Sequence, residues 1–330
     1  MKFIDLHCDT LMQTVKNGVS DLIEIQGSML DIKRMKEGGA STEFFAIFFP
    51  PLKSGLIELE GKTFSDEEYF DLLYKCYKNT MERGASYIAE AMNAKDIVKN
   101  ESSGKMSGIL TFEDGRLVDG SLDKMKKFYD MGIRLISLTW NGENCFGYPC
   151  SRDAAPMGLG LKDFGKEAVE YMNELGIIID VSHLSDGGFW DVVEISKKPF
   201  VASHSNCRSL SPHQRNLTDE MIKKMAEKGG IAGINFAPAF LQPDNANTDS
   251  TVELLSLHLR KMLSLGGEDF PALGSDLDGI TGNLEVGCIS KMSLIFDRLK
   301  ADGVNERVIE KIAYTNAFRV IKETMLQFGK

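Results

Sequence analysis

The chain has 330 residues, of which 38 are Lys or Arg and 48 are Asp or Glu, giving a formal net charge of -10. Hydrophobic residues make up 43% and charged residues 26%, values that exclude disordered, collagen-like and coiled-coil classes. No basic stripe is present, and a phosphate backbone is bound by clustered Lys and Arg, so we expect no nucleic-acid partner.

We also expect no signal peptide and no lipid anchor. It holds no run of 18 apolar residues, so we expect no transmembrane helix and no membrane attachment. The first residues lack an apolar segment with a cleavage site, and the last lack a hydrophobic tail. The six cysteines form no CxxC pair, which favours free thiols in a reducing cytoplasm. Cys145 and Cys150 are the one pair that could form a local bridge or act in redox chemistry.

Eight short apolar runs along the chain are predicted to be strands. They are continuous rather than alternating, which is typical of parallel strands buried on both faces. Several follow a glycine at the end of a helical pattern, where a helix ends and a strand begins. The eight runs cover residues 2–7, 43–49, 108–112, 133–139, 176–181, 200–203, 230–236 and 271–275.

The stretches between these runs have apolar residues at helical spacing. We predict helices over 163–175, 219–227 with Thr218 as N-cap, 252–265 and 306–326. The connection between the second and third runs is longer than the others. We predict that it is an elaborated crossover with a helix from about 65 to 83. Residues 141–160 are expected to form a long loop after the fourth strand.

Eight strands that alternate with helices predict a (β/α)8 TIM barrel of the α/β class, with a doubly wound open sheet as the competitor. The length would also allow two domains, but α/β barrels often run past 300 residues as one. We therefore expect residues 1–330 to form a single domain. Catalytic residues of such barrels lie at the C-terminal ends of the strands.

The predicted strand ends carry groups that suit metal ions. His7 and Asp9 are alternate residues and should point to one place, while Cys8 faces elsewhere. The third, fifth and sixth strands end near Glu113, His183 and His204. Three imidazoles and two carboxylates exceed the three ligands of one open catalytic zinc, and they suit two metals that share a carboxylate. His213 and His258 are not expected to be ligands.

In these segments the sequence resembles the membrane (renal) dipeptidases and their bacterial relatives, a branch of the amidohydrolase-like barrels. The resemblance extends over nearly the whole chain and implies a binuclear zinc site and hydrolysis of dipeptides. It rests on DLHCD at 5–9, FEDG at 112–115, IDVSH at 179–183, SHS at 203–205, RNL at 215–217 and GSDLDG at 274–279.

The resemblance also implies roles for individual residues. His7 and Asp9 match the ligands of one zinc ion, His183 and His204 match those of the other, and Glu113 matches the bridging carboxylate. Asp276 matches the catalytic aspartate near the bridging water. Arg215 matches the arginine that receives the terminal carboxylate of the substrate, a task that suits a guanidinium fork. The family resemblance favours a homodimer.

One position departs from the family pattern. The renal enzymes have a histidine at the end of the fourth strand, thought to bind or polarise the substrate carbonyl, and here Trp140 stands in its place. A tryptophan donates only its indole N–H and carries no charge. Either Trp140 shapes the pocket and the zinc ions alone stabilise the oxyanion, or Asn141 acts as the donor.

The sequence thus predicts a cytoplasmic zinc dipeptidase with two Zn²⁺ per subunit, acting on dipeptides, including L,D-dipeptides, through a metal-bridging hydroxide. Asp276 would accept the proton of the water and pass it to the leaving amine. Three alternatives stay open: a zinc-dependent hydrolase of another small amide or lactone (an N-acyl amino acid or a β-lactam), a metal-dependent phosphoesterase, and a non-catalytic barrel used as a scaffold.

Overall fold

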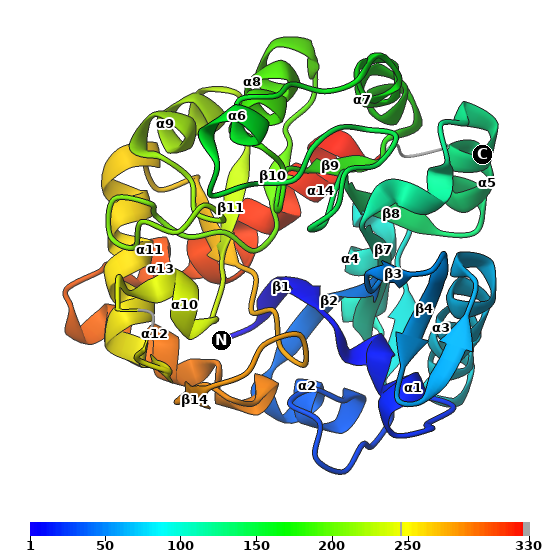
Figure 1. Cartoon of the computed structure of the whole chain (residues 1–330). Helices are drawn as coiled ribbons and strands as arrows, with labels where there is room; N and C mark the ends of the chain where they lie inside the picture. The colour runs from blue at the N-terminus through cyan, green and yellow to red at the C-terminus, as the bar shows by residue number, and fades with distance from the viewer. Residues whose placement is uncertain (245, 326–330) are drawn as a thin grey trace.

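The computed structural model describes residues 1–244 and 246–325. Its centre is a closed barrel of eight parallel strands surrounded by helices (Figure 1), so the predicted (β/α)8 fold is confirmed. The ring closes because β2 pairs with both β1 and β7, as in the register Phe48 to Glu113. The barrel strands are β1 (Phe3–Cys8), β2 (Ala40–Phe48), β7 (Met106–Glu113), β8 (Ile133–Ser137), β9 (Ile178–Asp180), β10 (Val201–Ala202), β11 (Ile231–Ile234) and β13 (Pro271–Leu273).

The helices follow the predicted pattern closely where their ends carry clear signals. Ser65 and Glu68 form a capping box at the start of α3, and the Thr218 side chain accepts from the backbone N–H of Met221 at the start of α9. The helices of eight or more residues are α3 (Asp66–Arg83), α4 (Ala94–Ser102), α5 (Leu122–Asp130), α7 (Asp163–Leu175), α8 (Asp186–Ile195), α9 (Asp219–Glu227), α11 (Val252–Gly266), α12 (Ser293–Ala301) and α14 (Asn316–Thr324).

The shorter elements are those that the sequence pattern does not reveal. The crossover after β2 contains an antiparallel three-stranded sheet and a further strand, β6, which pairs with β7 beside the barrel. The predicted C-terminal helix is two helices joined by a π-helical turn at Lys311–Thr315, and its expected end at Leu326 lies outside the described residues. The small strands are β3 (Leu52–Lys53), β4 (Leu56–Leu59), β5 (Lys62–Phe64), β6 (Ile88–Glu90), β12 (Asp249–Ser250) and β14 (Asn283–Leu284), and the short helices are α1 (Gln13–Lys16), α2 (Ile32–Gly38), α6 (Ala154–Met157), α10 (Pro238–Leu241) and α13 (Glu306–Glu310).

The interior of the barrel is apolar at one end and polar at the other. Ile109 and Glu113 are four residues apart on β7 and therefore share a face. Ile109 belongs to an apolar cluster with residues of α14, the helix that crosses behind the strands in Figure 1. Glu113, at the C-terminal end, lies within 3.5 Å of three histidines. The fold thus closes the N-terminal end of the barrel with α14 and collects polar groups at the other end.

Within the described residues, no helix is long and apolar enough to cross a membrane. The six cysteines of the chain are all free, so Cys145 and Cys150 form no bridge.

Candidate active site

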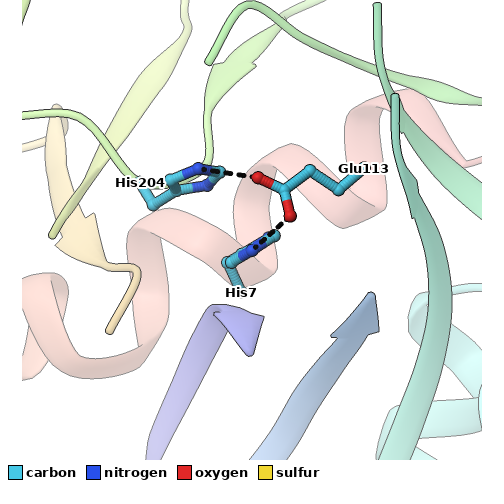
Figure 2. Close-up of side chains that lie close together, drawn as sticks. All are labelled: His7, Glu113 and His204. Atoms are coloured by element: carbon cyan, nitrogen blue, oxygen red, sulfur yellow. Dashed lines mark ion pairs between the residues drawn. The ribbon is translucent and has the colours of Figure 1, made fainter. Parts of the chain in front are cut away.

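The five side chains predicted as metal ligands lie together at the C-terminal end of the barrel, although they come from four different strand ends. All five are at most 8% exposed. Glu113 lies between two groups of candidate ligands, and Figure 2 shows it between His7 of the first group and His204 of the second. Its Oε2 is 3.5 Å from His7 Nε2, while its Oε1 is 3.0 Å from His183 Nε2 and 3.5 Å from His204 Nε2. One carboxylate therefore faces both groups with a different oxygen.

A second set of acidic groups surrounds His7. Its Nε2 lies 3.7 Å from Asp9 Oδ1 and 3.8 Å from Asp276 Oδ1. Ligand atoms of His7, Asp9 and Asp276 lie within 4.8 Å of one another, as do those of His7, Glu113 and His204. His7 and Asp9 thus point to the same place as predicted, and Cys8 is buried in the outer core.

The backbone at two of these positions departs from strand geometry. His183 has φ 67° and Asp276 has φ 61°, in the left-handed region that non-glycine residues rarely adopt. Each stands just beyond the end of its strand, and the Asp276 N–H donates to the carbonyl oxygen of His7 at 3.1 Å. This turn directs the Asp276 side chain towards His7 and Asp9.

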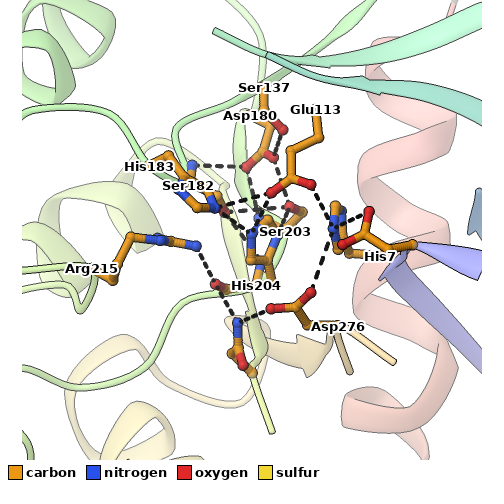
Figure 3. Close-up of polar contacts among 12 residues, drawn as sticks. His7, Glu113, Ser137, Asp180, Ser182, His183, Ser203, His204, Arg215 and Asp276 are labelled. Carbon is orange, nitrogen blue, oxygen red and sulfur yellow. Dashed lines mark hydrogen bonds and ion pairs between the residues drawn. The ribbon is translucent and has the colours of Figure 1, made fainter. Parts of the chain in front are cut away.

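Both histidines of the second group are held in one orientation by neighbouring polar side chains; Figure 3 shows those around His204. The Ser203 hydroxyl donates to Asp180 Oδ2 at 2.6 Å and therefore accepts from His204 Nδ1, 2.7 Å away. His183 Nδ1 lies 3.1 Å from Asn141 Oδ1, which can only accept. Each ring therefore has its proton on Nδ1 and directs the lone pair of Nε2 towards Glu113, the tautomer that a metal ligand requires.

The buried charges have opposite effects on the two groups of histidines. Burial, together with the positive charge on Arg215 and His7, lowers the pKa of His183 and of His204 well below its ordinary value. Burial alone would lower the pKa of His7 too, but the carboxylates of Glu113 and Asp9 outweigh it, so that the pKa of His7 is raised well above its ordinary value. His183 and His204 are therefore neutral at pH 7, whereas the surroundings of His7 favour a positive charge.

The surroundings of the acidic groups favour the binding of a cation. Burial and the charge of Asp9 raise the pKa of Glu113 to about 8, and burial raises that of Asp276 to about 6. Among the described residues, Glu113 Oε2, Asp9 Oδ1 and His7 Nε2 are buried without a hydrogen-bond partner. Buried polar atoms are rarely left unpaired unless an ion or water binds them. The donor set of imidazoles and carboxylates fits zinc.

The predicted substrate-binding residues surround this cluster. The Arg215 side chain is buried and donates to Ser205 Oγ at 3.3 Å and to the His204 carbonyl oxygen at 3.2 Å, while its Nε has no partner among the described residues. Trp140 lies against Phe48, with ring centroids 4.8 Å apart, and 5.9 Å from the ring of His183. The Asn141 oxygen is already engaged by His183, so Asn141 orients this histidine.

The two remaining histidines lie outside the cluster. His258 is buried on α11, where its Nδ1 accepts from the Cys207 N–H and its Nε2 donates to the Leu241 carbonyl oxygen at 2.8 Å. His213 Nδ1 accepts from the Arg215 N–H at 3.2 Å.

Two residues of the site were not identified from the sequence. Asp180 accepts from the hydroxyls of Ser137 and Ser203, and Asn235 donates to Asp276 Oδ2 at 2.9 Å. Asn235 follows β11 directly. Reading the polar residues at the end of the seventh predicted strand, as for the third, fifth and sixth, would have identified it. Asp180 stands within the IDVSH segment, but its role depends on side-chain directions that the sequence does not give.

The chain is similar to known dipeptidases and metallopeptidases. Residues 1–327 match the family model described as membrane dipeptidase, peptidase family M19. The chain is 32% identical to an uncharacterized protein encoded in the pqqA 5′ region of Klebsiella pneumoniae, over 76% of this chain and 94% of that one. It is 26% identical to a dipeptidase of Claviceps purpurea, over 89% of this chain and 69% of that one. A metallopeptidase of Rhodobacter sphaeroides, solved with a phosphinate mimic of the dipeptide L-Ala-D-Ala, superposes with TM-score 0.87 at 28% identity, covering 98% of this chain and 99% of that one.

Proposed function

Because the chain belongs to the membrane dipeptidase family of metallopeptidases, we propose that it hydrolyses dipeptides, including L,D-dipeptides, with two zinc ions bound at the C-terminal end of its barrel. The observation that carries the proposal is the position of Glu113, with one oxygen towards His7 and the other towards His183 and His204. The inclusion of L,D-dipeptides is supported by the Rhodobacter relative, which was solved with a phosphinate mimic of L-Ala-D-Ala.

Each group of ligands would hold one ion. His7 and Asp9 would bind the first, His183 and His204 the second, and Glu113 would bridge them. When bound, the pair would lower the pKa of a shared water and polarise the scissile carbonyl. The neutral Nε2 atoms of His183 and His204 and the unpaired oxygens of Asp9 and Glu113 support this assignment.

Asp276 would transfer the proton. Its Oδ2 is held by Asn235, whereas its Oδ1 faces His7 and Asp9 and is free to accept a proton from the attacking water. The same atom would then give the proton to the leaving amine, so that one carboxyl group serves as base and acid in turn.

The substrate would be held at its charged ends. Arg215 would bind the terminal carboxylate, and the carboxylates around His7 provide a place for the free amine. Trp140 would form a wall beside His183 and, unlike a histidine, would take no part in proton transfer. Because both ends of the substrate are bound, a longer peptide would leave one of these interactions unmade.

The test is to load the purified protein with zinc, measure metal by mass spectrometry, and assay L,L- and L,D-dipeptides beside an N-acyl amino acid and a phosphoester. We expect two zinc ions per chain and release of free amino acids. Glu113→Gln should lower zinc content and abolish turnover. Glu43→Gln is the matched control, because Glu43 is equally buried but lies beside Cys8 and Asp5.

Zinc-loaded protein that cleaves the phosphoester or the N-acyl amino acid but no dipeptide would overturn the proposal. The homodimer and the cytoplasmic location remain predictions, to be measured by light scattering and by cell fractionation.

A further inference from the structure

A cavity of about 400 Å³ opens beside the candidate active site. It lies between the loop after β8, which continues into α6, and the loop after β10. Its size falls in the usual range for small-molecule pockets. The polar residues that line it are Ser151, Arg152, Arg208, Ser211, His213 and Gln214.

The lining of this cavity is cationic, although the protein as a whole is acidic. No carboxylate is among the described residues that line it. Arg208 is neutralised by Asp186, with two hydrogen bonds of 2.7 and 2.8 Å. Arg152 is exposed and forms no ion pair within the described part of the chain. One uncompensated guanidinium therefore faces solvent in this cavity, and an anionic group is the natural partner for it.

The cavity is connected to the site through shared residues. Arg208 and Gln214 also line a small recess that includes His183 and Arg215. The loop that carries Arg152 is fastened to the candidate ligand His183, because the Cys150 N–H donates to the His183 carbonyl oxygen at 2.6 Å. Arg152 thus stands on the side of the site where Arg215 lies.

We infer that Arg152 is a specificity-determining residue that selects dipeptides with a carboxylate on the side chain of their second residue, such as Ala-Glu or Ala-Asp. The inference rests on the proposed function, in which Arg215 binds the terminal carboxylate. The second residue of the substrate then lies next to Arg215, and its side chain is the one that reaches this cavity. Arg152 and Arg215 would bind the two carboxylates of one residue.

The experiment compares kcat/KM for Ala-Glu and Ala-Gln, which have the same shape and differ in charge, with L and D forms of the second residue. We expect the wild-type zinc enzyme to prefer Ala-Glu by about tenfold, the size of one charge-assisted hydrogen bond at a partly exposed site. Arg152→Met should bring the ratio towards one, mainly through the KM for Ala-Glu. Arg152→Lys should retain part of the preference, and high salt should reduce it in the wild type.

Lys127→Met is the matched control, since it removes one exposed positive charge on α5 and should leave the ratio unchanged. Zinc content and melting temperature of each variant show that the site is intact. An equal preference for Ala-Glu in wild type and Arg152→Met would overturn the inference. So would efficient cleavage of a tripeptide, Ala-Ala-Gly, that depends on Arg152, because the cavity would then hold a chain extension. Failure to cleave any dipeptide would overturn the proposed function as well, whereas dipeptide cleavage without charge preference overturns this inference alone.

Discussion

The substitution Gly279→Ala tests whether activity depends on the present positions of the carboxylates of the site. A Cβ atom at this position would stand 2.5 Å from Asp276 Oδ1 and still closer to Asp9 Oδ2. The φ of Gly279 is not in the left-handed region, so an alanine fits the backbone and the effect of Gly279→Ala falls on the two side chains.

The size of the effect follows from the distances. Non-bonded heavy atoms are most stable at about 3.5 Å, so Asp276 Oδ1 must move by about 1 Å and Asp9 by more. A displacement of 1 Å at a reacting group lowers the rate by about 100-fold, or about 2.7 kcal/mol in the barrier. We therefore expect kcat/KM for a dipeptide to fall by about two orders of magnitude, with weaker zinc binding because Asp9 is a proposed ligand.

The assay is steady-state hydrolysis at saturating zinc, together with a zinc titration of the metal-free protein. Gly142→Ala is the control, because an added Cβ there has no heavy atom within 4 Å and the residue lies in the loop beside Asn141. Gly279→Ala with wild-type kcat/KM and wild-type zinc affinity would refute the reasoning, since it would mean that Asp9 and Asp276 can move without consequence.

Three further predictions concern single side chains. Asp276→Asn should keep both zinc ions and lower kcat by about 10²–10⁴-fold; a wild-type rate would rule out the proton route. Arg215→Ala should mainly raise KM, as measured by initial rates. A decrease in kcat alone would contradict the proposal that Arg215 binds the terminal carboxylate of the substrate. Burial lowers the pKa of His258 to about 4. Between pH 6.5 and 4 the unfolded chain therefore binds more protons than the folded chain. The contribution of the neutral, buried His258 to the free energy of unfolding is complete above pH 6.5 and should fall by about 3 kcal/mol as the pH is lowered to 4. Urea unfolding should show a larger loss of stability between pH 6.5 and 4 in the wild type than in His258→Gln, by about 3 kcal/mol, because the buried His183 and His204 contribute equally to both proteins.

The sequence predicts which side chains meet at the C-terminal end of the barrel because each of them follows a strand whose apolar run is easy to recognise. His7, Glu113 and His204 are more than 90 residues apart along the chain, and only the closure of the barrel brings them together. At β1, the rule that successive side chains of a strand point to opposite faces does not by itself predict which residues face the barrel interior. Leu6 belongs to the apolar interior cluster and its neighbour His7 also faces the interior, which is possible because the pairing of β1 with β2 shifts register between Asp5 and Cys8.

What the sequence does not reveal is structure without a strong apolar pattern. The strands β3 to β5 have two to four residues, many of them exposed, and β6 has three, too few for a period to be recognised. Asp278 illustrates the same limit for polar residues. It lies in the same GSDLDG segment as Asp276, yet it accepts hydrogen bonds from Thr10, Gln13 and Ser28 and thereby holds the loop after β1. Asp276 and Asp278 thus have different roles within one motif, and only the directions of their side chains in the structure distinguish these roles.

The unpaired atoms of the site also connect metal binding to the stability of the fold. Each buried polar atom without a partner costs about 1–3 kcal/mol, and Glu113 Oε2, Asp9 Oδ1 and His7 Nε2 are three such atoms in one place. A bound cation removes this penalty and joins strands that are distant in the chain, so its binding free energy adds to the free energy of unfolding. In chelator, Glu113→Gln should therefore be more stable than the wild type, because it removes a buried carboxyl, whereas in excess zinc the order should reverse. The same groups that make the metal-free barrel less stable are thus the ones that give it affinity for a cation.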